Sequence, residues 1–218
     1  MPTNLSANEA RVIGCLIEKS IVTPDQYPLT LNGLTNACNQ KSSRDPVMSL
    51  TQGEVQRTTR LLAAKHLVRV EENFNSRAEK YLQRFCNTRY SDYQFEPPQL
   101  AVVCLLVRRG PQTPGELKSR SGRLHSFADN DEVVEALGAL IEREGGPLVV
   151  KLPRTPGRKD AEYMHLLSGP VDVEAHASQS EAQVSAKSSA RVSTTELEQR
   201  VSKLEADVAE LRELLSKD

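Results

Sequence analysis

The same order of helix-forming and strand-forming segments occurs twice along this chain, about 80–90 residues apart. In the first occurrence, capping boxes begin helices at Ser6 and Thr51, and Thr30 caps another helix between them. The segments 67–72 and 78–85 then predict two strands joined by a polar turn. Three helices followed by a β-hairpin are the order of a winged helix-turn-helix domain.

The second occurrence begins with an amphipathic helix over 99–109, and Thr113 caps the helix that follows. A third helix is expected over 129–144, before a hairpin formed by 148–152 and 161–167. The residues expected on the inner face of this third helix are Val133, Val134, Leu137, Leu140 and Ile141. The repeated order indicates a duplication at the level of the fold.

We therefore predict a mainly α fold with small β-hairpins (α+β), in which residues 1–95 and 96–170 form two tandem winged helix-turn-helix domains. Residues 171–193 are rich in Ser, Ala, Gln and Glu without periodicity, which is typical of a flexible linker. Residues 194–218 are expected to form a coiled-coil helix, because apolar residues there alternate at spacings of four and three. These residues are Leu197, Val201, Leu204, Val208, Leu211 and Leu215.

The charges beside this apolar seam favour a parallel homodimer. In a parallel pair, Arg200 faces Glu205 of the partner subunit, and Asp207 faces Arg212 of the partner subunit, so that both pairs attract. In the centred antiparallel pair, like charges would face each other at Glu205 and at Asp207. The alternative is that this helix packs on its own chain, although a repeat of about 3.5 residues is that of a coiled-coil seam.

Composition argues against several classes of protein. The chain has no Trp, five Tyr and four Phe, which disfavours a surface that stacks single-stranded nucleic acid. Its longest apolar run, Leu100 to Val107, is eight residues and too short to span a bilayer. The N-terminus has no basic segment followed by an apolar one. We expect a cytoplasmic protein without a membrane partner.

Cysteine spacing and known motifs give no indication of a metal, a cofactor or an enzyme. The cysteines at 15, 38, 86 and 104 and the four histidines do not have the spacing of a zinc site. Cys15 and Cys104 lie in apolar helical stripes, where a reduced thiol behaves as a small core residue. An iron–sulfur cluster is the unsupported alternative. Phosphate-binding, dinucleotide-binding, zinc-protease and serine-hydrolase motifs are absent.

The third helix of the first domain carries residues suited to DNA. Winged helices that read DNA place this helix in the major groove. Val55, Thr58 and Leu62 are expected to face the core, and the opposite face carries Gly53, Gln56, Arg57 and Arg60. Glutamine can bridge N6 and N7 of adenine, and arginine can fork onto guanine or a phosphate. The alternative is an ordinary solvated helix face.

Three further cations belong to the expected contact with double-stranded DNA: Lys41, Arg44 and, on the first hairpin, Arg77. Lys41 and Arg44 lie in the segment 39–50, which is about twelve residues long where a helix-turn-helix usually has three or four. This segment either binds a ligand, a peptide or a phosphate, or is a structural insertion in which Arg44 pairs with Asp45.

The equivalent helix of the second domain is acidic. Its solvent face is expected to carry Glu132, Glu135 and Glu142, which would repel phosphates. Its hairpin is basic, with Lys151, Arg154, Arg158 and Lys159, and is either a solvated turn or a phosphate contact. We expect the first domain alone to read DNA.

Two long motifs and the first helix resemble a known family. YPLTLNGLTNACNQKSSRDPV (27–47), QTPGELKSRSGRLHSF (112–127) and EARVIGCLIEK (9–19) are similar to the YceH family of uncharacterised bacterial proteins. The resemblance implies tandem winged-helix domains and supplies no functional residues, since the role of that family is not established. Gln83 stands where the family pattern tends to have a histidine.

Two functions follow from this sequence. The first is a non-enzymatic, dimeric DNA-binding protein with a regulatory role in transcription. It is supported by the net charge of +3 in residues 1–95, from 12 Lys and Arg against 9 Asp and Glu. The alternative is a winged-helix scaffold for protein–protein interaction that binds no DNA. The net charge of −1 for the whole chain and of −4 for residues 171–218 favours this alternative.

Overall fold

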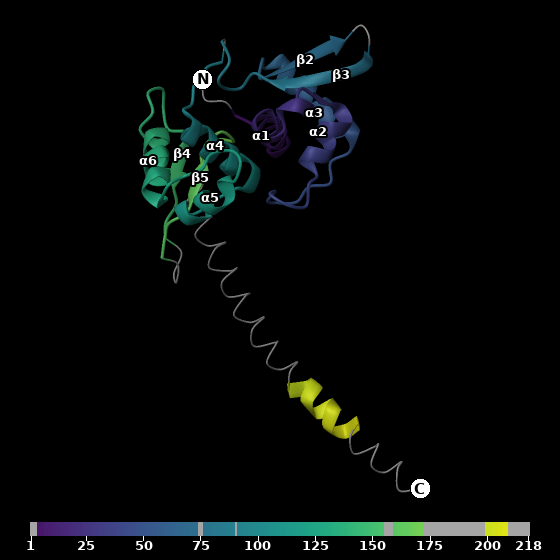
Figure 1. Ribbon diagram of the computed structural model, residues 1–218, viewed down its shortest axis with the longest axis vertical. Helices are drawn as coiled ribbons and strands as arrows, with labels where there is room; N and C mark the ends of the chain where they lie inside the picture. Colours follow the sequence, from purple (N-terminus) through teal and green to yellow (C-terminus); the bar gives the residue numbers. More distant parts are fainter. Residues whose placement is uncertain (1–3, 74–75, 90, 155–158, 172–198, 209–218) are drawn as a thin grey trace. The chain divides into compact units, whose positions relative to one another are not determined.

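The computed structural model describes residues 4–73, 76–89, 91–154, 159–171 and 199–208 (Figure 1). The chain divides into two compact units. The larger unit extends to residue 171 apart from 155–157, and the described part of the smaller one is a helix over 199–208. The elements of the larger unit are α1 (Ala7–Val22), η1 (Pro24–Gln26), β1 (Leu29–Thr30), α2 (Leu31–Cys38), α3 (Gln52–Ala64), β2 (Val68–Asn73), β3 (Ser76–Gln83), α4 (Pro97–Arg109), α5 (Pro114–Ser121), α6 (Asn130–Ile141), β4 (Val149–Lys151) and β5 (Tyr163–His165).

Capping boxes begin α1, α3 and α5, as the sequence predicts. The Ser6 hydroxyl accepts a hydrogen bond from the backbone N–H of Glu9, whose carboxylate accepts one from the Ser6 N–H. The same reciprocal pair begins α3 at Thr51 and α5 at Thr113. These bonds satisfy backbone donors that a helix start otherwise leaves unpaired, so the local sequence determines where each helix begins.

The described strands form two small antiparallel sheets. In the first, β3 lies between β1 and β2, and Tyr81 of β3 is opposite both Leu29 and Val70. This sheet packs against α1, α2 and α3. In the second, β4 pairs with β5, with Val150 opposite Met164. The α+β class is confirmed. The second hairpin is shorter than predicted, and the pairing of β1 with β3 was not predicted.

One continuous core connects the two occurrences of the repeated order. Helices α1 and α4 pack against each other, and Ile13 and Leu16 of α1 belong to the same buried cluster as Val103 and Leu106 of α4. In the segment between β3 and α4, the Tyr93 ring stacks on Phe95 with centroids 5.8 Å apart and contacts Phe85 in a tilted arrangement at 4.9 Å. The division of this unit at residue 95 stays a prediction.

The inner face of α6 differs from the prediction at Val134, whereas Ile141 packs against the core as predicted. Val133, Leu137 and Leu140 are buried, whereas Val134 is 45% exposed and Ile141 is only partly buried. The buried residues form a stripe with spacings of three and four, and Val134 lies about 100° around the helix from it. The sequence prediction made this apolar stripe one residue too wide.

The cysteine thiols belong to the buried core. All four cysteines are free and buried, which confirms the prediction for Cys15 and Cys104.

Across the described ranges, none of the helices combines the length and the apolar character that a bilayer-crossing segment requires.

We predict that Gly14→Ala destabilises the protein by about 1–3 kcal/mol, because an added Cβ would overpack the α1–α4 contact. This Cβ would lie 2.7 Å from Cγ of Arg108 and 3.1 Å from Cγ1 of Val107. Gly138→Ala in α6 is the control, since its Cβ would have nothing within 4 Å. The control should gain about 0.5–1 kcal/mol of helix propensity. Urea unfolding measures both, and equal midpoints would contradict the prediction.

We also predict a loss of stability in mild acid. Burial lowers the pKa of His165 to about 4, from an ordinary value near 6.5. Between these values the unfolded chain binds the proton and the folded chain does not, so stability falls as the pH falls. The loss is roughly 3 kcal/mol between pH 7 and pH 4. His165→Leu should remove this slope from unfolding free energies measured against pH, and parallel curves for the two proteins would contradict the assignment.

Candidate nucleic-acid interface

Helix α3 presents two arginines to solvent on the side opposite its buried face. Val55, Thr58 and Leu62 are buried, as predicted, while Arg57 and Arg60 are exposed. The prediction missed Leu61, which is 55% exposed. An apolar residue between Arg60 and the buried Leu62 gives no indication in the sequence that its side chain faces solvent. The remaining exposed residues of α3 are Gln52, Gly53 and Ala64.

The residues of this face are chemically suited to a nucleic acid, which offers phosphates and hydrogen-bonding base edges. Gln56 is partly buried at the border of the face. A Cβ on Gly53 would meet nothing within 4 Å, so a ligand can approach the backbone there. The carboxylate nearest the start of the helix, Glu54, accepts hydrogen bonds from the Thr51 backbone and hydroxyl at 2.7 Å, and these bonds lower its pKa. That negative charge is therefore engaged in capping.

Arg44 does not fit the DNA contact that the sequence suggests. Its side chain is fully buried, and its Nη2 lies 2.5 Å from Oε2 of Glu18 on α1. Its Nε donates to the Ala37 carbonyl at 3.0 Å. A phosphate cannot reach this guanidinium, and the alternative pairing with Asp45 is also wrong. Lys41, by contrast, is exposed.

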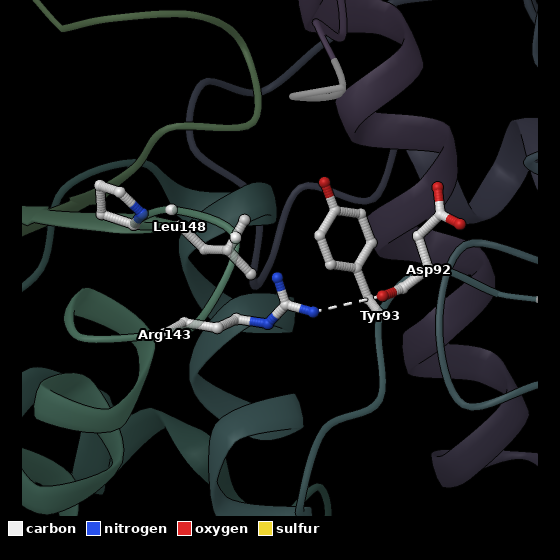
Figure 2. A pocket seen from close by; sticks show the side chains of 7 residues that line it. Asp92, Tyr93, Arg143 and Leu148 are labelled. Atoms are coloured by element: carbon white, nitrogen blue, oxygen red, sulfur yellow. Dashed lines mark hydrogen bonds between the residues drawn. The ribbon is translucent and has the colours of Figure 1, made fainter.

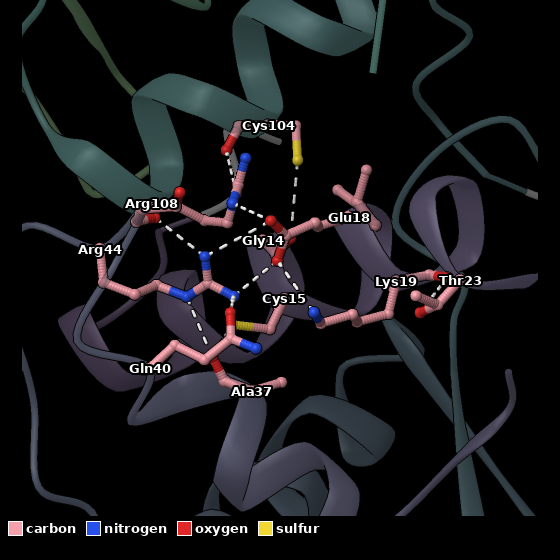
Figure 3. A network of polar contacts seen from close by, with 12 residues as sticks. Gly14, Cys15, Glu18, Lys19, Thr23, Ala37, Gln40, Arg44, Cys104 and Arg108 are labelled. Carbon is pink, nitrogen blue, oxygen red and sulfur yellow. Dashed lines mark hydrogen bonds and ion pairs between the residues drawn. The ribbon is translucent and has the colours of Figure 1, made fainter. Parts of the chain in front are cut away.

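A buried network holds Arg44 in this position (Figure 3). The Glu18 carboxylate accepts hydrogen bonds from Arg44 and from Arg108 of α4, which is 2% exposed. Burial acts to raise the pKa of Cys15, but the Cys38 thiol and the Arg44 guanidinium outweigh it and lower the pKa. The sequence prediction missed Glu18 and Arg108, whose positions on amphipathic helices give no indication of a pair.

The segment 39–50 is a structural insertion. Asn39 exchanges two hydrogen bonds with the backbone of Leu50, at 2.7 and 2.8 Å. Arg11 of α1 donates to the Pro46 carbonyl at 2.7 Å. The N–H of Asp45 donates to the Arg108 carbonyl at 3.0 Å. The insertion is thus fixed at both of its ends and at its middle, immediately before α3.

The remaining predicted contacts are placed in part. Arg77 belongs to strand β3, and its side chain lies outside the described residues. On α6, Glu135 is exposed, as is Glu142 at its C-cap, whereas Glu132 is partly buried and bonded to His125 at 2.8 Å. The exposed cations described at the second hairpin are Lys151, Arg154 and Lys159, and Arg158 lies outside the described residues.

A cavity of about 370 Å³ lies beyond the end of α6 (Figure 2). The Arg143 guanidinium is 5.1 Å from the centre of the Tyr93 ring and donates to the Asp92 carbonyl at 3.2 Å. Gly145 and Gly146 have positive φ angles and form the turn at its rim. The arginine here serves to join this turn to residues 92–93. Within the described ranges, no group of three His, Cys, Asp or Glu side chains could hold a metal ion.

The helix over 199–208 exposes its apolar positions. Val201, Leu204 and Val208 are 52%, 57% and 47% exposed in the single chain. The other predicted seam residues, Leu197, Leu211 and Leu215, lie outside the described residues. The described part of the helix therefore presents an uncovered apolar stripe.

Comparisons with known proteins place these features in one family. Residues 5–158 match a family model described as "Protein of unknown function, DUF480". A UPF0502 protein of Shewanella woodyi is 55% identical over 214 residues, which cover 97% of each chain. A UPF0502 protein of Vibrio atlanticus is 51% identical over 215 residues, 99% of this chain and 98% of its own. One from Cronobacter sakazakii is 47% identical over 215 residues, with coverages of 99% and 96%.

Proposed function

The chain belongs to the DUF480 family of proteins of unknown function, and we propose that it is a non-enzymatic, dimeric DNA-binding protein that regulates transcription in the cytoplasm. The observation that carries this proposal is the exposed face of α3. Arg57 and Arg60 extend into solvent from a helix that is capped at its start and buried along its other side. That helix offers two cations on a rigid support.

The order of elements supports two tandem winged-helix domains. Helices α1, α2 and α3 precede the β2–β3 hairpin, and α4, α5 and α6 precede β4–β5. In a winged helix that binds DNA, the third helix enters the major groove and the hairpin contacts the backbone or the minor groove. Helix α3 would thus be the reading helix, with β2–β3 as its wing.

The residues of α3 would divide the work of recognition. Gln56 would bond adenine, and Arg57 and Arg60 would bond guanine or phosphates. Lys41, exposed near the start of the insertion 39–50, would contact a phosphate. The exposed Leu61 is suited to the methyl group of thymine.

Dimerisation would occur through a parallel coiled coil over 194–218. The stripe of Val201, Leu204 and Val208 is half-exposed in the single chain, and a second copy would cover it. Two copies would present two reading helices, which suits a DNA site with two-fold symmetry.

A protein-interaction scaffold is the second candidate. Helix α6 exposes Val134 beside Glu135, a combination that suits a protein partner better than a phosphate backbone. Under this alternative, α3 would be a solvated surface or part of the same docking area.

We predict that the wild-type protein binds random-sequence duplex DNA and that affinity falls steeply with salt. Arg57→Ala with Arg60→Ala should weaken binding by about 2–6 kcal/mol in total and flatten the salt dependence. Arg123→Ala with Lys203→Ala removes the same charge from exposed positions outside α3 and is the control. Fluorescence anisotropy measures all three. Absence of wild-type binding at about 50 mM salt would reject DNA binding in favour of the scaffold.

We predict that Leu204→Glu converts the dimer to a monomer, because it places two charges in the apolar seam of the coiled coil. Ala206→Glu adds the same charge at the outward-facing position of the same helix and should leave the dimer intact. Light scattering after size-exclusion chromatography gives the mass of each. A monomeric wild type, or equal masses for the two variants, would contradict the proposed interface.

A further inference from the structure

Helix α4 packs against α1 at Gly14. A Cβ at this position would lie 2.7 Å from Cγ of Arg108, so the arginine side chain crosses α1 where α1 has no side chain of its own. Arg108 is 2% exposed, and its Nε donates to the Cys104 carbonyl at 3.0 Å. Its guanidinium is therefore directed from the second occurrence of the repeated order into the first.

Arg108 holds two parts of the first occurrence at once. Its Nη1 donates to Oε1 of Glu18 (Figure 3). Its backbone carbonyl accepts the N–H of Asp45 at 3.0 Å. The first bond fixes the carboxylate on α1, and the second fixes the insertion 39–50. Both bonds are at the last turn of α4.

Glu18 passes this constraint to Arg44. The second carboxylate oxygen, Oε2, lies 2.5 Å from Nη2 of Arg44. Arg44 in turn donates to the Ala37 carbonyl, to its neighbour Ser43 and to the Gln40 side chain, at 2.8 to 3.0 Å. One carboxylate thus orients the guanidinium that joins the end of α2 to the insertion.

The insertion ends where α3 begins. The Asn39 side-chain amide donates to the Leu50 carbonyl and accepts from the Leu50 N–H, and Thr51 is the N-cap of α3. A continuous series of contacts therefore runs from α4 through Glu18 and Arg44 to the first turn of α3.

We propose that Arg108 is a positioning residue for DNA recognition: it fixes the orientation of α3 through Glu18 and Arg44, although it does not contact DNA itself. This inference rests on the proposed function of α3. It assigns the second half of the unit a role in affinity that its acidic α6 face does not provide. The two occurrences then bind DNA as one rigid body.

The test is Arg108→Met in the full chain, a change that keeps much of the side-chain volume and leaves the Glu18–Arg44 pair in place. We expect backbone amides of 39–50 and of the first turn of α3 to exchange hydrogen about tenfold faster. Affinity for random-sequence duplex DNA should fall about tenfold, with the salt slope unchanged because the phosphate contacts are the same. Arg108→Lys should restore part of both losses, because it returns a cation to Glu18.

Arg123→Met is the matched control, since it removes an exposed cation after α5 and should leave exchange in 39–50 unchanged. Equal acceleration of exchange throughout α5 and α6 in Arg108→Met would indicate a general loss of stability and overturn the inference. Unchanged exchange in 39–50 would also overturn it. A wild type that binds no DNA refutes the proposed function, and the role of Arg108 in recognition with it. Exchange in 39–50 would still report separately whether Arg108 holds the insertion.

Discussion

A single buried carboxylate determines how the parts of the larger unit fit together. Glu18 accepts hydrogen bonds from two arginines that lie 26 and 90 residues away along the chain. A buried charge is costly unless it is paired, and removal of one partner leaves an uncompensated ion. Both guanidiniums pair with this carboxylate. The charges of α1, α4 and the insertion 39–50 are therefore neutralised only when the three segments pack in one arrangement. That requirement is directional, which apolar burial is not.

The end of α2 is stabilised by the same set of charges. The carbonyls of Ala37 and Cys38 accept hydrogen bonds from Arg44 and Arg11, at the helix terminus where the backbone dipole favours cations. Helix α2 is only eight residues long, too short to be stable by itself. Its position therefore depends on guanidiniums supplied by α1 and by the insertion. These contacts in turn fix the orientation of the α3 face that we propose for DNA contact.

Local chemistry made much of this fold predictable, and distant pairing made the rest unpredictable. The capping residues Ser6, Thr51 and Thr113 identify helix starts from four consecutive positions each. The buried side of α3 follows from its period. Arg44 was misplaced because its neighbours are polar and give no indication that the insertion folds inward. The two-residue strand β1 is too short for alternation, and the pair between Glu18 and Arg108 spans 90 residues. A pattern of neighbouring residues cannot predict a pair of residues so far apart in the chain.

The distribution of charge between interior and surface bears on how DNA would be recognised. In the first 95 residues the buried arginines, Arg11 and Arg44, are balanced by the buried glutamates, Glu9 and Glu18. The excess of three positive charges in this segment therefore belongs to residues outside the core. It is small, and the tail of −4 opposes it at long range. Non-specific attraction to a duplex would be weak, so affinity would depend on a few well-placed contacts from α3. Such contacts require a rigid helix and gain from a second copy, since linked sites bind together more tightly than either alone.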